Sequence, residues 1–196
     1  MNGSGFDMRL GIESALRRAL PYGGLPGNDS PQTAFFDAAT EGDLRRLREL
    51  ASGKDAEEKA WLADVSIQGV GPFQAAARLG KVDVCRCLVE ELGFDINAGS
   101  KIGVTALAAA ALDGKMDVVR YLLDNGADPN KKDNAGSVPL HCAAKFVATT
   151  YGLTDCMKYL LKAGADPNIP NSHCGAMPIQ LAASCGRRKH VELLFP

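Results

Sequence analysis

The sequence predicts an all-α fold, a solenoid of stacked helix-turn-helix units with hairpin loops between the units. Three observations support this prediction. The pentapeptide Gly-Ala-Asp-Pro-Asn occurs twice, at residues 126–130 and 164–168. A pattern of two alanines, two further residues and a glycine recurs through most of the chain. Apolar residues with helical periodicity follow each of these glycines, so each unit should contain two helices.

Five copies of the alanine-pair pattern define five units. Their glycines lie 38, 34, 38 and 34 residues apart, at Gly42, Gly80, Gly114, Gly152 and Gly186. Insertions account for the excess over a unit of about 33 residues. We therefore expect a flexible N-terminal arm over residues 1–32 and a repeat domain over residues 33–196. The units should span roughly 33–66, 67–100, 101–134, 135–172 and 173–196.

The first helix of each unit begins just before the alanine pair. Pro139 and Pro178 suit the first helical position, because their missing N–H is one that the helix could not have used and their φ is already helical. A threonine whose hydroxyl could cap this helix is present only at Thr33 and Thr105. The other units carry glycine, valine or methionine there, and losing such a cap to an apolar residue costs about 1 kcal/mol.

The second helix of each unit should end in the repeated turn. Gly126 and Gly164 can adopt the left-handed conformation that a β-carbon disfavours, and the proline that follows stops the helix from continuing. In the second unit the turn occupies residues 93–97, which is one residue late. We attribute the delay to an extra residue within 90–92. The repeated pentapeptide thus marks the end of one helical hairpin and the start of the next.

These residues carry a resemblance to a known family. Val-Pro-Leu-His-Cys-Ala-Ala at 138–144 resembles the ankyrin motif Thr-Pro-Leu-His-x-Ala-Ala, and Gly-Ala-Asp-Pro-Asn resembles the turn between ankyrin repeats. The resemblance covers residues 33–195. It implies that partner proteins bind at the tips of the inter-repeat loops and along the first helices. The corresponding loop-tip positions are Lys101, Ile102, Asp133, Asn134, Ala135, His173 and Cys174, and the helix positions are Arg78, Leu79, Leu112, Asp113, Lys145, Phe146 and Ser184.

Two insertions depart from the repeat pattern. The first, at residues 52–62, carries the only tryptophan, Trp61. We expect Trp61 to pack against the end of the first unit, because large aromatic side chains are mostly buried; the alternative is an exposed anchor for a partner. The second insertion, at 147–151, should lengthen a helix and pack locally. Its alternative role is a contact patch formed by Phe146 and Tyr151, since aromatic residues are enriched at interface cores.

Charge and hydropathy argue against several classes of partner. The chain has 22 Lys and Arg against 23 Asp and Glu, so its net charge of -1 creates no strong attraction to nucleic acid or anionic lipid. The longest apolar stretch, 104–112, is far shorter than the ~20 residues that cross a bilayer. No secretory signal precedes the six cysteines, so we expect them to be thiols in a cytoplasmic or nuclear protein.

No residue pattern predicts a catalytic centre, a cofactor or a metal site. His141 and Cys142 are accounted for by the motif, and three further cysteines fall at slots that are apolar in other units: Cys85, Cys87 and Cys156. The spacing of the remaining cysteines and histidines matches no paired zinc signature. We therefore expect a monomeric, non-enzymatic module that binds another protein. The alternative is a regulatory or targeting portion of a longer enzyme or chaperone-adaptor chain.

Overall fold

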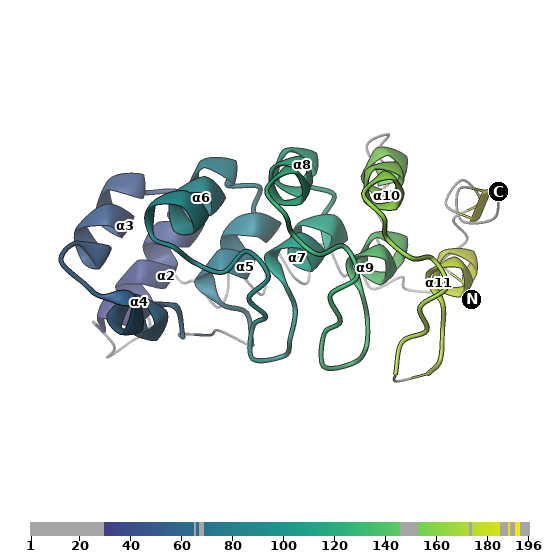
Figure 1. The fold of residues 1–196 in the computed structure, drawn as a ribbon, viewed down its shortest axis with the longest axis horizontal. Helices are drawn as coiled ribbons and strands as arrows, with labels where there is room; N and C mark the ends of the chain where they lie inside the picture. Colours follow the sequence, from purple (N-terminus) through teal and green to yellow (C-terminus); the bar gives the residue numbers. More distant parts are fainter. Residues whose placement is uncertain are drawn as a thin grey trace, which may run out of the picture.

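The computed structural model describes residues 30–64, 66, 69–145, 153–172, 174–184, 188 and 191–192, and it confirms the predicted solenoid of paired helices. The helices form two rows that lie side by side (Figure 1). The inner row contains α2 (Pro31–Glu41), α5 (Pro72–Arg78), α7 (Ala106–Leu112), α9 (Pro139–Lys145) and α11 (Pro178–Ser184). The outer row contains α3 (Leu44–Ala51), α6 (Val82–Arg86) with a π-helical turn (Cys87–Glu91), α8 (Met116–Asp124) and α10 (Leu153–Lys162).

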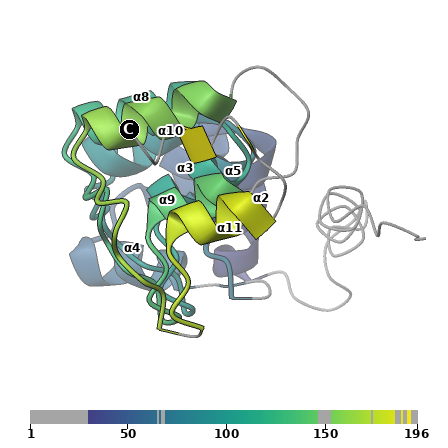
Figure 2. The ribbon, with the colours of Figure 1, turned by 90° about the vertical axis from the view of Figure 1, so that its right-hand side faces the viewer.

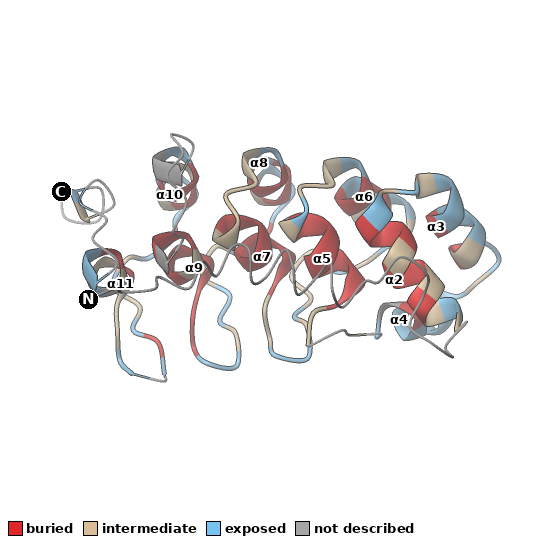
Figure 3. Ribbon diagram, turned by 180° about the vertical axis from the view of Figure 1, so that it is seen from behind, coloured by how far each residue is buried: buried red, intermediate tan, exposed pale blue. Residues whose placement is uncertain are grey.

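The alanine pairs form the centre of the inner row. Ala76 in α5, Ala110 in α7 and Ala144 in α9 are each fully buried. A methyl side chain allows neighbouring helices to approach closely, and the inner helices α5, α7 and α9 are accordingly the most buried part of the stack (Figure 3). The outer helices bury only one face. The array therefore has a core that runs continuously from unit to unit.

The starts of the inner helices differ from unit to unit. The Thr105 hydroxyl accepts a hydrogen bond from the Ala108 N–H at 3.1 Å, which confirms the predicted cap of α7. The predicted cap at Thr33 is wrong, because α2 begins at Pro31 and Thr33 lies inside its first turn. Ser30 caps α2 instead, accepting from the Thr33 N–H at 3.2 Å. The Ser-Pro pair supplies both the capping oxygen and a φ that is already helical.

The inner helices α9 and α11 have no hydroxyl at their N-terminus, but a side chain from the first turn makes a different capping hydrogen bond. His141 Nδ1 accepts a hydrogen bond from the Val138 N–H at 3.1 Å, and Gln180 Oε1 accepts from the Met177 N–H at 2.8 Å. Each contact is one half of a capping box, in which a side chain in the first turn reaches back to the residue before the helix. These two hydrogen bonds offset part of the stability that we expected the helices to lose without a capping threonine.

The repeated turn connects each unit to the next. Gly126 and Gly164 adopt φ values of 90° and 91°, which confirms the predicted left-handed helix ends. The Asn130 side chain accepts from the Asp166 N–H at 2.8 Å and donates to the Gly164 carbonyl at 2.9 Å. Asn97 makes the equivalent contacts with the turn that begins at Gly126. The last residue of one turn thus holds the first and third residues of the next.

Hydrogen bonds also join the outer helices. The Tyr121 hydroxyl donates to Glu90 at 3.1 Å, and the equivalent Tyr159 hydroxyl donates to Asp124 at 2.9 Å. Burial, followed by the bond to Glu90, raises the pKa of Tyr121 to about 12. Each tyrosine thus ties its helix to the preceding unit.

A π-helical turn accommodates the extra residue of the second unit. Within it, the Leu92 N–H donates to the Cys87 carbonyl at 3.0 Å, and the Phe94 N–H then donates to the Leu88 carbonyl at 2.9 Å. Cys87 and Leu88 remain buried. Because the wider turn absorbs one residue, the following loop can still align with the loops of the other units.

The first insertion forms α4 (Ala56–Ala63), which lies beside α2 below the two rows in Figure 1. The Gln32 side chain donates to the Trp61 carbonyl at 2.7 Å. Leu62 is fully buried, whereas Trp61 is 51% exposed, so the predicted burial of Trp61 is wrong. Successive helical residues are about 100° apart, so a helix that buries Leu62 directs Trp61 elsewhere. The second insertion, at 147–151, lies outside the described residues.

Candidate functional site

Three loops project from the inner row side by side, like the teeth of a comb (Figure 1), and all point in the same direction (Figure 2). We refer to them as finger A (98–104), finger B (131–137) and finger C (169–176). The Asn134 N–H on finger B donates to the Ile102 carbonyl on finger A at 3.1 Å, and the Ser172 N–H on finger C donates to the Ala135 carbonyl at 2.9 Å. These backbone hydrogen bonds fix the spacing of the fingers.

Glycines allow the fingers to pack this closely. Gly103 and Gly136 have φ values of 78° and 71°, which L-residues rarely adopt. A β-carbon at Gly103 would lie 2.7 Å from the Asn134 nitrogen, and one at Gly136 would lie 2.6 Å from the Ser172 nitrogen. Each contact would involve the backbone of the next finger. The comb therefore requires glycine at both positions.

The structure assigns internal contacts to some of the expected fingertip residues. Asp133 accepts hydrogen bonds from the N–H groups of Ala135 and Ser137 at 2.9 and 2.8 Å, and the Asn134 amide donates to the Lys101 carbonyl at 3.1 Å. The Lys101 and Ile102 side chains face solvent, and Ile102 is 47% exposed. Lys101 and Ile102 thus form the accessible part of finger A.

The expected helix residues form a second strip. Arg78 and Leu79 lie at the end of α5, and Leu112 and Asp113 lie at the end of α7. Arg78 Nε donates to Asp113 at 2.9 Å, and only 12% and 28% of their side chains remain exposed. Leu79 is 40% exposed and Leu112 is half-buried. Seven helical residues, about 10 Å, separate this strip from the fingers.

The other expected contact residues are only partly described. Ser184 and Cys174 are exposed, and each makes a side-chain contact within its own loop or helix. Lys145 ends α9, but its side chain is not described. Phe146, Tyr151 and His173 lie outside the described residues.

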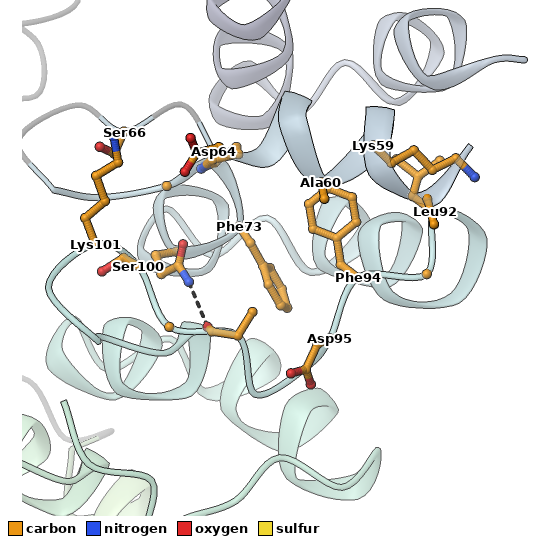
Figure 4. Close-up of a pocket in the computed structure, with 17 residues that line it drawn as sticks. Lys59, Ala60, Asp64, Ser66, Phe73, Leu92, Phe94, Asp95, Ser100 and Lys101 are labelled. Atoms are coloured by element: carbon orange, nitrogen blue, oxygen red, sulfur yellow. Dashed lines mark hydrogen bonds between the residues drawn. The ribbon is translucent and has the colours of Figure 1, made fainter. Parts of the chain in front are cut away.

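A pocket that the sequence did not reveal lies between α4, the start of α5 and residues 92–101. Its volume is about 360 Å³. Phe73 and Phe94 lie along its apolar part, with Asp64 and Lys101 toward one end (Figure 4). Two features of the sequence could have indicated the pocket. One is the insertion that forms α4, and the other is Phe94, which replaces the alanine of the repeated turn.

Two buried cysteines are poor nucleophiles, and the described residues hold no cluster of metal ligands. Burial raises the pKa of Cys85 and of Cys156 to about 12, so neither supplies a thiolate near neutral pH. Within the same part of the chain, no three His, Cys, Asp or Glu side chains gather as a set of metal ligands. The arrangement described above is suited to binding.

The family model of ankyrin repeats in three copies matches residues 35–133 and, in an overlapping placement, residues 73–171. The chain belongs to the ankyrin repeat family. Ankyrin repeats generally mediate interactions between proteins. The family thus accounts for the alanine pairs, the glycine-ended helices and the comb of fingers in one architecture.

Three relatives share parts of the array. Protein phosphatase 1 regulatory subunit 27 of Homo sapiens is 37% identical over 105 residues, covering 54% of this chain and 65% of that protein. Alpha-latroinsectotoxin-Lt1a of Latrodectus tredecimguttatus is 47% identical over 66 residues, covering 34% of this chain and 5% of the toxin. Protein fem-1 homolog A of Bos taurus is 37% identical over 70 residues, covering 36% of this chain and 11% of that protein. The chain thus matches less than two thirds of each relative.

None of the described helices combines the length and the apolar character needed to span a bilayer.

Proposed function

We propose that this ankyrin array is a non-catalytic, monomeric module that binds a partner protein across finger A and the helix ends of units two and three. One observation carries the proposal. Three large hydrophobic side chains are exposed in the described part of the chain, and two of them, Leu79 and Ile102, occupy positions that the family resemblance assigns to partner contact. An apolar side chain at such a position gains free energy when a partner removes it from water.

The charges of this surface favour a partner of mixed character. Arg78 and Asp113 neutralise each other across the boundary between two units. Lys101 adds a single positive charge beside Ile102. A uniformly acidic or basic ligand would find little complementary field here, whereas a folded protein or peptide with both apolar and charged side chains would.

Substitution of the exposed leucine and isoleucine tests this function. We expect Leu79→Asp combined with Ile102→Asp to remove partners that the unchanged chain captures from a cell extract, because an aspartate placed against a partner's apolar surface loses its hydration. Arg45→Glu on α3 is the control, since 87% of the Arg45 side chain is exposed on the outer row. Identical partner lists for all three proteins, with unchanged helicity, would disprove the location.

A regulatory role is a second candidate, favoured by the identity with protein phosphatase 1 regulatory subunit 27 over 105 residues. In this role the chain is a regulatory or targeting portion of a larger assembly. Direct binding to the purified catalytic subunit of protein phosphatase 1 would support it, and absence of binding at micromolar concentrations would exclude that enzyme as the target.

We infer that the protein works in the cytoplasm or nucleus. Four cysteines of the described part of the chain are free thiols, which supports a reducing compartment: Cys85, Cys87, Cys156 and Cys174.

A further inference from the structure

We propose that the pocket between α4 and residues 92–101 is a second binding site, which takes an aromatic side chain from an extended peptide. This site goes beyond the proposed function, because Lys101 is the one expected contact residue among the residues that line the pocket. The lining otherwise comes from α4, from the start of α5, and from the segment that descends from the π-helical turn to finger A. A peptide in the pocket can therefore bind independently of the helix-end strip.

The pocket forms where α4 takes the place of the repeated turn between units one and two. Gly69, just before α5, still lies against finger A, since a β-carbon there would be 3.0 Å from Ile102 Cγ2. Between fingers A and B, and again between B and C, backbone hydrogen bonds of 3.1 and 2.9 Å close the gap. α4 approaches finger A as a helix, and it turns Ala56, Lys59 and Ala60 toward the gap. These positions lie on one helical face, and that face carries no large apolar side chain to fill the space between α4 and the opposite wall.

The opposite wall is held rigidly. The Phe94 ring stacks on Phe35 of the first unit, with 6.0 Å between ring centroids. The Gln74 amide donates to the Ala98 carbonyl at 3.0 Å, the bond drawn in Figure 4. Asp95 accepts from the Asn97 N–H at 2.9 Å and fixes the turn between them. A wall set in advance loses little freedom when a ligand binds.

The shape and the side chains select the chemistry of the ligand. At about 360 Å³ the pocket lies at the lower end of the range for small-ligand sites, which suits one large side chain with adjoining backbone. Phe94 is half-buried and offers part of its ring, against which an aromatic ring can stack or pack edge to face, whereas Phe73 is only 3% exposed and adds little accessible surface. Figure 4 shows both phenylalanines in the middle of the lining.

Charged groups at the two ends favour a peptide with polar residues on both sides of the aromatic one. Asp64 and Lys101 lie toward one end, and Lys59 and Asp95 toward the other (Figure 4). Within the described residues these four side chains form no ion pairs with one another or with other groups. Each end can therefore pair with a flanking charge of either sign.

Titration of the full chain with capped single amino acids tests the site. The probes are the N-acetyl amides of phenylalanine, leucine and alanine, and the readout is the set of backbone amide shifts in an NMR spectrum. We expect the phenylalanine probe to shift Gly71, Gly93 and Gly99 in a saturable way. The alanine probe should bind at least about tenfold more weakly, because it lacks the ring that the pocket would bury.

Two variants of one exposed residue show where the probe binds. Ala60→Glu places a longer, charged side chain in the α4 wall and should abolish the shifts, whereas Ala60→Ser should retain them. Ala163→Glu is the matched control, since Ala163 is exposed and does not line the pocket. Because both alanines are exposed, neither change removes a core contact.

Four results would overturn the proposal. They are an absence of saturable shifts with the phenylalanine probe, equal affinity for the leucine probe, shifts that persist in Ala60→Glu, and shifts centred on Leu79 and Leu112 in place of the pocket glycines. If Ala60→Glu alone moved the amide signals of residues 1–29, the pocket would hold the chain's own N-terminal segment, which would also overturn the proposal. None of these results would affect the binding strip tested by Leu79→Asp.

Discussion

One asparagine side chain in the repeated turn holds two units together. Asn130 satisfies a carbonyl and an N–H of the next turn, while its own N–H donates to Asp128 at 2.8 Å. We expect Asn130→Ala to lower the free energy of unfolding by about 0.5–1.5 kcal/mol, because two exposed hydrogen bonds between units are lost and water replaces them only in part. Urea denaturation followed by circular dichroism measures the change.

Asn168 provides a control within the same chain. It ends an identical pentapeptide, and its N–H makes the same contact with Asp166 at 2.8 Å. Its side chain makes no hydrogen bond with any described residue and is exposed. Asn168→Ala should therefore change stability by less than about 0.5 kcal/mol. Equal losses for both asparagines would show that the turn, and not the link between units, sets their importance.

Buried thiols make the protein sensitive to alkali. Burial raises the pKa of Cys85 and of Cys156 from 9.0 to about 12, so the folded state keeps protons that the unfolded chain releases earlier. This contribution to stability is complete below pH 9 and is lost as the pH rises toward 12. Tyr121, whose pKa rises from 10.0 to about 12, adds to the same decline. We expect the melting temperature to fall across this range.

A natural substitution from another unit isolates the thiol effect. Cys156 occupies the slot that Val118 fills in the preceding unit, and both side chains are fully buried. Cys156→Val should thus fold normally and flatten the decline in melting temperature between pH 9 and 12. An unchanged slope would mean that Cys156 ionises at a similar pH in the folded and unfolded states.

The comb depends on glycines that meet the next finger. Gly136 has φ 71° and faces the Ser172 backbone, whereas Gly175 has φ 67° and a β-carbon there would meet nothing within 4 Å. Both Ala substitutions place a side chain in a left-handed backbone, which costs about 1 kcal/mol or more. Only Gly136→Ala adds a collision with backbone. We expect the loss of stability in urea to be larger for Gly136→Ala by about 1–3 kcal/mol.

Hydrogen exchange at Ser172 locates the effect. Its N–H donates to the Ala135 carbonyl at 2.9 Å. Gly136→Ala should speed exchange at this amide, because the two fingers must move apart. Similar exchange rates in the Gly136→Ala and Gly175→Ala proteins would contradict the close packing of fingers B and C.

The paired helices can be predicted because their residue patterns are local in the sequence. Contacts between units join residues that are far apart in the sequence, so they are harder to predict. Gly126 shows the first case, since its conformation follows from the end of its own helix. Asn130 shows the second, because its partners lie 34 and 36 residues away. Residue type alone favours a buried Trp61. The neighbouring Leu62 decides the orientation of α4, and the weakly amphipathic sequence of that helix gives no strong sign of it.

The proposed binding surface is predictable only as a set of positions. The family pattern locates Leu79 and Ile102, which are exposed as expected of contact residues. It cannot show that Arg78 pairs with Asp113 in the following unit, because that contact joins the ends of two inner helices. The pocket beside α4 escapes prediction for a similar reason. It combines an insertion, a π-helical turn and a phenylalanine that meet only when the units stack.

Among the described inner helices, α11 should open more readily than α7. α7 packs against both α5 and α9, whereas α11 packs against α9 alone among the described inner helices. In a linear array each unit is stabilised mainly by its neighbours, so a unit with two interfaces is harder to open than a unit with one. A packing defect should therefore have different consequences at these two places.

Two buried alanines at equivalent positions allow this difference to be measured. Ala110 in α7 and Ala182 in α11 are both fully buried, and replacing either with leucine forces extra volume into a packed interface at a cost of about 1–3 kcal/mol. In Ala110→Leu both interfaces of a central unit weaken, so hydrogen exchange should speed up throughout α5, α7 and α9. In Ala182→Leu the faster exchange should stay within 178–184, because α11 contacts only α9 among the described inner helices and its opening leaves α5, α7 and α9 stacked. Uniform acceleration along the chain in both proteins would instead mean that the array unfolds as a single cooperative block.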